Sequence, residues 1–457
     1  MNRNEPIAAI STPYGRGGIA VIRMSGEGVL SLADRIFRPA GGQPLSSLGG
    51  GRTAYGEILY DGAAIDDGIA AVFRAPHAFT GEDTVEISCH GGVLLTQRVL
   101  EAALLAGCRM AEAGEFTKRA FLNGKISLSQ AEAVIGLIDA ASEEQLKLSS
   151  ASSRGVLHGK VNALADELTE LIASVYAYID YPDEDLTDMT AEELAARARR
   201  LHGELTALVA SYRTGRAVNE GIPTVIAGKP NTGKSSILNR LLGRERAIVT
   251  DVAGTTRDTV EETAAVGRVT LRLCDTAGLR DTEDAVEKIG VDRSLEKLNE
   301  ADLVLAVFDS SKPLDEEDRA FLALLNEREG CEILPILNKA DLGDLVTELP
   351  LSAKPIIVSA VTGEGFDELE ARISSLYVSE KLDYDVTAVL SSARQYAAAR
   401  TAEEHLASAC DALSSGFTQD VAGMDLELAL AALHELDGRG VSETITDRIF
   451  HRFCVGK

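Results

Sequence analysis

The stretch GKPNTGKSS, residues 228–236, constrains the fold of this chain more than any other feature. It follows the apolar run TVIA and precedes the run SILNRLL, so G-x-x-x-x-G-K-S stands between an expected strand and an expected helix. In such a loop Gly228 and Gly233 let backbone N–H groups surround phosphates, Lys234 reaches the outer phosphates, and Ser235 ligates Mg²⁺. This context disfavours a glycine-rich turn in an unrelated α/β domain. The stretch therefore predicts a nucleotide-binding α/β domain.

A second motif indicates which base the nucleotide carries. NKAD follows the apolar run ILPIL and resembles the N-K-x-D element of GTPases. Asp341 would accept hydrogen bonds from the guanine N1 and exocyclic amine, a donor pair that adenine lacks. Asn338 would bind the other edge of the purine, Lys339 would pack over the base, and the loop SAVTGEG, which begins at Ser359, would lie beside it. The motif favours GTP and disfavours a generic P-loop ATPase.

Two further motifs have the order and spacing of GTPase switch elements. DTAG would supply Asp275 as an outer partner of Mg²⁺ and Gly278 as γ-phosphate sensor, and TDVAGTTRD would supply Thr256 to close over Mg²⁺. The residue after DTAG is Leu279, where many GTPases carry a glutamine that orients the attacking water. Because a leucine side chain has neither donor nor acceptor, another group must orient the water.

The amino-terminal region has an α+β pattern. From residue 6 to about 120, the β-rich runs PIAAIS, GIAVIRMS, GIAAVFRA and DTVEISC alternate with glycine turns and two expected helices, around 27–37 and 92–107. Residues 121–218 are expected to be helical, because apolar residues such as Leu164, Leu168 and Leu171 recur at helical spacing. Within this region TAEE, from Thr190, has the form of a capping box.

Between residues 221 and 377, near-continuous apolar runs alternate with helical stretches, which predicts a doubly wound parallel sheet. Helical periodicity returns from 378 to 457. We therefore expect a multidomain α/β protein in which an α/β domain is inserted into a helical domain whose two halves pack together. Two separate helical domains remain an alternative.

Composition limits the environment and the partners of the chain. Its 457 residues, 45% hydrophobic and 25% charged, suffice for several domains. The start MNRNEPIAAISTPYGRGG lacks an apolar h-region, and no segment approaches the ~20 apolar residues of a membrane span, so we expect a cytoplasmic protein without membrane contact. Six widely spaced cysteines argue against disulfides and structural zinc. The formal net charge of −26 disfavours broad binding to nucleic acid, so RNA contacts should be local or supplied by a partner.

Four stretches together, GKPNTGKSS, DVAGTTRD, DTAGLR and the final FCVGK, resemble the MnmE (TrmE) family of tRNA modification GTPases. This family is one of the TrmE-Era-EngA-like P-loop GTPases, and the resemblance covers essentially the entire chain. It implies a tetrahydrofolate-binding and dimerisation domain at 1–120 and a TrmE-type G domain at 220–377. The helical domain would be formed by 121–219 and by 378–457, which carries the FCVGK tail.

The resemblance also supplies a replacement for the missing glutamine. It implies a K⁺ ion where an arginine finger would lie, and a fixed positive charge there offsets the negative charge that develops between the β- and γ-phosphates. The attacking water would be oriented by Glu287, although Glu283 and Asp284 are close enough to compete, and a solvated helix face is the alternative reading of Glu287. The implied K⁺ ligands are Asn231, Thr250, Val252 and Thr255, and the implied Mg²⁺ ligands are Ser235 and Thr256.

By the same resemblance, Lys234 and Glu287 act in catalysis, and the contacts with GTP and its metal ions come from several loops. The implied contacts are Asn231, Thr232, Gly233, Lys234, Ser235, Ser236, Thr250, Asp251, Val252, Ala253, Gly254, Thr255, Thr256, Asp275, Thr276, Ala277, Gly278, Asn338, Lys339, Asp341, Ser359 and Ala360.

A second site is expected in the amino-terminal domain. The glycine loop with Arg16 and Arg23 is a plausible carboxylate-binding constellation, but the residues alone favour a tight turn with a surface salt bridge. The resemblance implies a one-carbon tetrahydrofolate, 5-formyl in its stable form and 5,10-methylene as donor, in contact with Arg23, Glu86, Lys125 and Lys457. Basic neighbours would lower the pKa of Cys454, which the resemblance makes a catalytic candidate near the folate; a buried inert thiol is the alternative.

The family works with the flavoprotein MnmG, in a heterotetramer built on a homodimer, to add a carboxymethylaminomethyl or aminomethyl group at C5 of the wobble uridine of certain tRNAs. This chain has no G-x-G-x-x-G after a strand, which agrees with a need for a separate flavoprotein. The partner is expected to make most contacts with tRNA. A ribosome-assembly or signalling switch is the alternative function, and such a switch would need no folate site.

Overall fold

The computed structural model describes residues 5–180, 190–244, 262–273, 301–328, 330–414, 419–441, 443–451, 453, 455 and 456. The chain folds as two compact units, residues 1–135 with 434–457 and residues 136–433. Among the helices of the described segments, none combines the length and the apolar character needed to cross a membrane.

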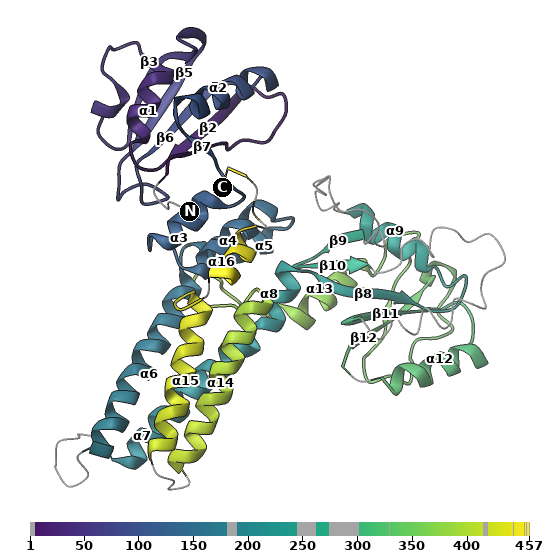
Figure 1. The fold of residues 1–457 in the computed structure, drawn as a ribbon. Coiled ribbons are helices and arrows are strands. Elements are labelled where there is room, and N and C mark those ends of the chain that lie inside the picture. Colours follow the sequence, from purple (N-terminus) through teal and green to yellow (C-terminus); the bar gives the residue numbers. More distant parts are fainter. Residues whose placement is uncertain are drawn as a thin grey trace. The chain divides into compact units, whose positions relative to one another are not determined.

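The first unit contains a seven-stranded sheet of order β3-β4-β5-β6-β2-β1-β7. Neighbouring strands in this sheet pair antiparallel, except that β1 and β7 pair parallel. Helices α1 (Val29–Ile36) and α2 (Val93–Ala106) pack on one face and share a single apolar core with the strands (Figure 1). The expected strands and helices of this region are confirmed, and β3, β4 and β7 were not foreseen. The strands are β1 (Ile7–Ile10), β2 (Ile19–Ser25), β3 (Phe37–Pro39), β4 (Arg52–Tyr60), β5 (Ala63–Phe73), β6 (Thr84–His90) and β7 (Arg109–Met110).

The end of the chain completes this first unit. Helices α3 (Glu115–Leu122), α4 (Leu128–Asp139) and α16 (Glu443–Phe450) meet in a small apolar core that contains Phe450 and Phe453. Beyond α16, Val455 forms an antiparallel bridge with Ala113. Residues from both ends of the sequence therefore build one unit.

In the second unit, α7 packs against α6 and α14 (Figure 1). Leu164, Leu168 and Leu171 are buried, as their spacing predicted. The capping box is confirmed, because the Thr190 hydroxyl accepts from Glu193 N at 3.2 Å and the Glu193 carboxylate accepts from Thr190 N at 2.7 Å. The helices are α5 (Glu143–Ser153), α6 (Val156–Asp180), α7 (Ala191–Ala210), α8 (Tyr212–Asn219), α14 (Ala393–Ser414) and α15 (Gln419–Asp437).

The same unit contains the expected doubly wound sheet, with order β13-β12-β11-β8-β10-β9. All neighbouring strands are parallel except β9, which joins β10 antiparallel at the edge, a feature not predicted. Central strand β8 is almost fully buried, which explains its mainly apolar sequence; the hydroxyl of its buried Thr224 donates to the Ile222 carbonyl at 2.8 Å. The elements are β8 (Ile222–Ala227), α9 (Lys234–Arg244), β9 (Glu262–Val266), β10 (Val269–Leu273), β11 (Leu303–Asp309), α12 (Glu316–Asn326), β12 (Glu332–Asn338), β13 (Ile356–Ile357) and α13 (Phe366–Tyr377).

Candidate functional site

The phosphate-loop sequence lies at the carboxyl end of β8 and leads directly into α9. This is the edge of a doubly wound sheet where ligands bind, and the amino terminus of the following helix favours anions. Lys234, the first residue of α9, donates its Nζ protons to the carbonyls of Gly228 and Lys229 at 2.8 and 2.7 Å. The Thr232 hydroxyl donates to the Lys229 carbonyl at 2.9 Å. The loop is therefore a compact turn closed by its own polar side chains.

Backbone conformation explains the glycines in this loop. Gly228 and Gly233 have φ of 150° and 94°, and a Cβ on either would overlap a neighbouring atom: the Val307 carbonyl oxygen or the Asn338 amide nitrogen. Asn231 adopts φ of 63° although it is not a glycine. Residues with a Cβ rarely occupy this region, and such outliers cluster at ligand sites. The predicted K⁺ ligand Asn231 thus occupies a left-handed position of this loop.

Asn338 connects the phosphate loop with the expected base loop. It ends β12 and is buried. Its Nδ2 donates to the Thr232 carbonyl at 2.9 Å, and its Oδ1 accepts from Ala360 N at 3.0 Å. Asp341 accepts at 2.6 Å from the hydroxyl of Ser359, which is buried. The structure therefore brings together phosphate-loop and base-loop residues that lie far apart in the sequence.

Arg240 on α9 is a residue of this site that sequence reasoning missed. Its guanidinium donates to the carbonyls of Ala360 and Val361 at 3.1 and 3.2 Å and to that of Thr362 at 3.1 Å. It also lies over the Phe366 ring, 5.4 Å from the centroid. One side chain therefore fixes three successive carbonyls of the base loop, and nothing in the local sequence around it signals that role.

Lys229 is a second residue that was not foreseen. Its ammonium pairs with Asp315, the N-cap of α12, and with Asp318 at 3.0 Å. Hydrogen bonds from Lys229 and from the backbone N–H of Asp318 lower the pKa of Asp315 to about 2. The phosphate loop is thereby tied to the start of α12, although Asp315 is largely exposed and the pair is screened by water.

Several predicted site residues lie outside the described segments, and their roles stay predictions. They are Thr250, Asp251, Val252, Ala253, Gly254, Thr255, Thr256, Asp275, Thr276, Ala277, Gly278, Glu287, Cys454 and Lys457, together with Leu279, Glu283 and Asp284.

The first unit brings two of the four predicted folate contacts together. Arg23 on β2 and Glu86 on β6 are directly opposed, and Arg23 Nε donates to Glu86 Oε1 at 2.8 Å. The guanidinium lies 5.5 Å from the centroid of the Phe116 ring. The Gly456 carbonyl accepts from Arg23 at 3.4 Å and from the Ser11 hydroxyl at 3.0 Å. Arg23, the sheet and the tail thus meet at one place.

Lys125 lies just after α3, is exposed, and passes beside Gly81. Its backbone N donates to the Ala120 carbonyl at 2.9 Å. Within the described part of the chain, its side chain forms no hydrogen bond or ion pair with Arg23 or Glu86. Lys125 therefore lies on the same unit as Arg23 and Glu86 but makes neither kind of contact with them.

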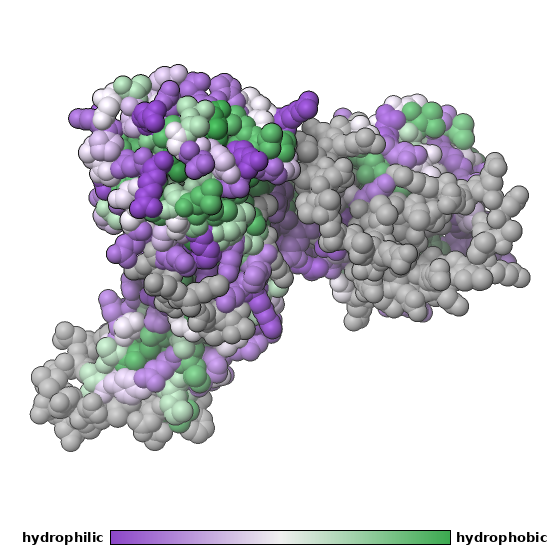
Figure 2. Space-filling model, turned by 45° about the horizontal axis from the view of Figure 1, so that its top comes forward, coloured by the Kyte–Doolittle hydropathy of each residue, from purple (hydrophilic) through white to green (hydrophobic). Residues whose placement is uncertain are grey.

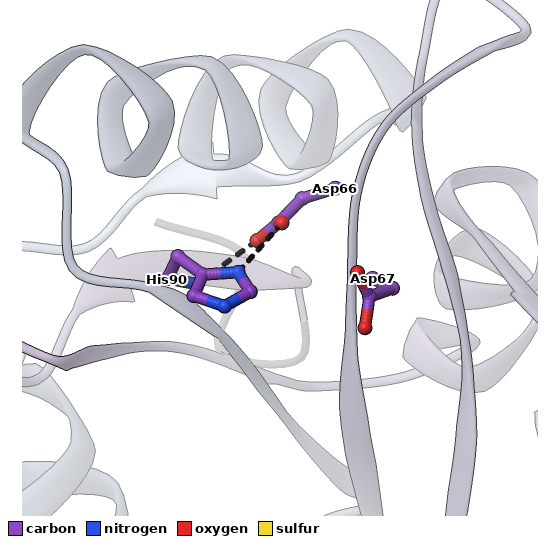
Figure 3. Close-up of side chains that lie close together, drawn as sticks. All are labelled: Asp66, Asp67 and His90. Carbon is purple, nitrogen blue, oxygen red and sulfur yellow. Dashed lines mark hydrogen bonds and ion pairs between the residues drawn. The ribbon is translucent and has the colours of Figure 1, made fainter.

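One group in the described segments has ligand atoms close enough for a metal ion: Asp66, Asp67 and His90, whose ligand atoms lie within 4.8 Å of one another. Figure 3 shows bonds between Asp66 and His90 alone. Both oxygens of Asp66 accept from His90, one from its Nδ1 at 2.8 Å and one from its backbone N at 2.9 Å. Asp67 accepts from the Tyr55 hydroxyl at 2.8 Å. The carboxylates are thus already engaged, and Asp66 raises the pKa of His90.

A parallel sheet with a phosphate loop after its central strand, joined by an asparagine to an N-K-x-D loop, defines a P-loop GTPase. Comparison with known proteins identifies the family. The MnmE helical domain matches residues 128–454, and the family described as GTP-binding protein TrmE N-terminus matches residues 6–125. The chain belongs to the MnmE family of tRNA modification GTPases.

Individual relatives have the same extent as this chain. The tRNA modification GTPase MnmE of Symbiobacterium thermophilum is 44% identical over 99% of both chains, and that of Geobacillus thermodenitrificans is 41% identical over 100% of both. Among solved structures, the G domain of the T. maritima FeoB iron transporter is 28% identical, with a TM-score of 0.24, and the match covers 33% of this chain and 96% of that one.

Proposed function

We propose that the protein is a potassium-activated GTP hydrolase that, with a flavoprotein partner of the MnmG type, modifies C5 of the wobble uridine of certain tRNAs from a one-carbon tetrahydrofolate. Two parts make up this proposal: GTP hydrolysis (the nucleotide half) and folate-dependent modification (the folate half). The double hydrogen bond of Asn338 to Thr232 and Ala360 is the observation that supports the nucleotide half. It holds the guanine-reading loop at a fixed place beside the phosphate loop. A carboxymethylaminomethyl or aminomethyl group would be the product.

The phosphate loop fits the metal ions that this function needs. Asn231, held at φ of 63°, offers an amide oxygen, the kind of ligand that hard cations prefer. Ser235 follows Lys234 in the first turn of α9, where a hydroxyl suits Mg²⁺. K⁺, when bound, would supply positive charge near the transferred phosphate. The other proposed ligands and the water-orienting Glu287 lie outside the described residues.

The Arg23 and Glu86 pair supports the folate half. The Arg23 guanidinium lies near two aromatic rings, 6.0 Å from the Phe79 centroid and 5.5 Å from the Phe116 centroid, and this group offers a cationic and partly apolar surface for a planar ring with polar edges. Glu86 offers the carboxylate acceptor that a pterin edge needs. We propose that this pair, with Lys125 and Lys457, binds the folate. The role of Cys454 stays open.

The first unit also offers a surface for the proposed homodimer. Tyr55 and Ile69 are opposed on β4 and β5, and both are more than 45% exposed, at 60% and 49%. Ile19 on β2 is 68% exposed. Figure 2 shows hydrophobic residues among hydrophilic ones on the surface of this unit. Apolar residues exposed on a sheet face are typical of an interface.

The domain boundaries, the contacts with tRNA and the location of the protein are also part of the proposed function. The domains would be 1–120, 121–219 with 378–457, and 220–377. The complex with the MnmG-type partner would bind tRNA mainly through that partner, because this chain has a formal net charge of −26. The protein would act in the cytoplasm.

GTP hydrolysis in KCl and in NaCl at equal ionic strength tests the nucleotide half. We expect faster turnover in KCl and a loss of that advantage in Asn231→Ala. A matched control is Asn326→Ala, at the far end of α12, where the side chain donates to the Pro350 carbonyl at 3.0 Å. Equal rates in both salts for the unmodified protein would remove potassium activation.

Titration with 5-formyltetrahydrofolate tests the folate half. Arg23→Gln should weaken binding by roughly tenfold or more, as expected when a charged hydrogen-bond partner is lost. Arg38→Gln is the control, because Arg38 forms a similar cross-strand pair with Glu57 at 2.9 Å on the same sheet. Absence of folate binding by the unmodified protein would favour a GTP-controlled switch instead.

A further inference from the structure

Strands β11 and β12 end side by side at the proposed base site. Asp309, the last residue of β11, is the register partner of Asn338, the last residue of β12. Lys339 follows at once. Since parallel strands point their carboxyl ends to one edge, the side chains just past these ends share the edge that binds the nucleotide.

Asp309 accepts hydrogen bonds from several groups in this place. Its Oδ2 accepts from Lys339 Nζ at 2.7 Å. Its Oδ1 accepts from the Ser311 backbone N at 3.1 Å and from the Ser311 hydroxyl at 2.6 Å. The Asp309 side chain is only 14% exposed, and that of Lys339 is 26% exposed. Burial alone would raise the pKa of Asp309, but the bonds from Lys339 and Ser311 hold it below its ordinary value. The carboxylate is therefore ionised and its direction is fixed.

Lys339 itself has an unusual backbone. Its φ is 70° and its ψ is 33°, in the left-handed region that residues with a Cβ rarely occupy. Such a conformation persists only where surrounding contacts hold it. The main chain on either side is held by Ser310 N, which donates to the Asn338 carbonyl at 2.9 Å, and by Ala340 N, which donates to the Val358 carbonyl at 3.2 Å. The Lys339 side chain forms an ion pair with Asp309.

We propose that Asp309 is a positioning residue for base recognition. It holds the ammonium of Lys339, so that the aliphatic part of this side chain lies where it packs over guanine, and it stabilises the left-handed turn that presents Asp341 two residues later. Asp309 does not touch the nucleotide and acts through Lys339. The inference rests on the guanine site of the proposed function and adds to it a residue outside the N-K-x-D motif.

A purely structural ion pair is the competing explanation, and the same strand offers a matched control. Asp302 directly precedes β11 at its opposite end and pairs with Arg216 at 3.0 Å. Asp302→Asn removes a charged partner from the same strand, at the end away from the base loop. A general disturbance of β11 would appear in both variants, whereas loss of base binding should appear only in Asp309→Asn.

The experiment measures the dissociation constants of fluorescent GDP and ADP analogues for the full chain and its variants. We expect Asp309→Asn to weaken GDP binding roughly three- to tenfold, the range of one charge-assisted hydrogen bond. KM for GTP should rise while kcat at saturation stays nearly constant. Lys339→Met should weaken GDP binding at least as much, and Asp302→Asn should leave it unchanged.

A double-mutant cycle separates positioning from simple stabilisation. If Asp309 acts through Lys339, Asp309→Asn has no further effect on GDP binding in the Lys339→Met background. Ser311→Ala provides a second route if Asp309→Asn does not fold. It removes only the hydroxyl that orients Asp309, and it should weaken GDP binding roughly twofold in the unmodified background and not in Lys339→Met.

The outcomes distinguish this inference from the proposed function. If the unmodified chain binds GDP no better than ADP, the guanine site itself is wrong. If it prefers GDP but Asp309→Asn binds GDP as tightly, or if the effects of Asp309→Asn and Lys339→Met simply add, the positioning role of Asp309 is wrong. Equal weakening by Asp302→Asn would also overturn it.

Discussion

The side-chain nitrogen of Asn338 and the carbonyl oxygen of Thr232 are joined by a hydrogen bond of 2.9 Å, which ties the end of β12 to the phosphate loop. The bond requires a close approach beside Gly233, because a Cβ on this glycine would overlap the Asn338 nitrogen. The phosphate loop and the proposed base loop thus approach each other at a point with no room for a larger residue than glycine.

Gly233→Ala should therefore abolish tight nucleotide binding. The added Cβ would displace Asn338, and alanine is strained at φ of 94°. We expect GDP affinity to fall more than tenfold, about 1.4 kcal/mol or more, in a fluorescence titration. Gly243→Ala on the same helix is the control. No atom lies within 4 Å of its added Cβ, so it should leave binding intact. Comparable losses in both variants would contradict this explanation.

Arg240→Met should loosen the base loop. Methionine keeps much of the aliphatic stem but leaves the carbonyls of residues 360–362 without their donor. We expect the free energy of unfolding to drop by roughly 1–3 kcal/mol and GDP binding to weaken several-fold, measured by denaturant unfolding and titration. Arg319→Met, an exposed arginine on α12, should change neither. Normal GDP affinity in Arg240→Met would show that the base loop keeps its conformation without Arg240.

Gly456→Ala should weaken folate binding and leave GTP hydrolysis unchanged. A Cβ there would overlap the Ile10 carbonyl oxygen, and φ is 98°. The displaced carbonyl would no longer accept from Ser11 and Arg23. We expect weaker 5-formyltetrahydrofolate binding, by roughly tenfold, with unchanged GTP hydrolysis. Val455→Ala serves as the control, since that side chain is 48% exposed. Folate binding at the unmodified level would mean that the tail is not part of the site.

The first unit should lose stability in acid through Glu115. Burial would raise the pKa of Glu115, but bonds from Arg109, Glu112 N and Arg119 lower it below the ordinary value. Its stabilising contribution is thus present above an ordinary pKa of 4.5 and is lost as pH falls through the lower value of the folded state. Protection factors for hydrogen exchange of residues 109–119, which are corrected for the intrinsic pH dependence of exchange, should therefore fall below pH 4.5. In Glu115→Gln these protection factors should already be low at pH 7 and depend less on acid; an unmodified pH profile in that variant would refute the assignment.

The sequence predicted those features that depend on neighbouring residues. The run TVIA, the phosphate-loop glycines and Lys234 lie within a few positions of one another, and the strand and helix follow from their spacing. The capping box at Thr190 is equally local. The predicted roles of Asn338 and Asp341 came from a motif, and the structure places both at the expected edge of the sheet.

Long-range partners could not be predicted in this way. Arg240 and the Ala360 carbonyl are 120 residues apart, and Lys229 and Asp315 are 86 apart. Each is a common surface residue type without a local pattern, so only the fold reveals the pairing. The expected pterin acceptor Glu86 holds Arg23, a partner set by strand register rather than by sequence. The edge strand β9 was also missed, although its antiparallel pairing with β10 is local and crosses a short turn at Gly267.

Ser11 and Gly456 are 445 residues apart, yet they share a hydrogen bond within one compact unit. During synthesis, the amino-terminal sheet leaves the ribosome long before the segment that completes it. The contacts that Val455 and Gly456 make with this unit can form only when translation has passed Gly456, so the hydrogen bond to Arg23 is among the last that the unit can acquire.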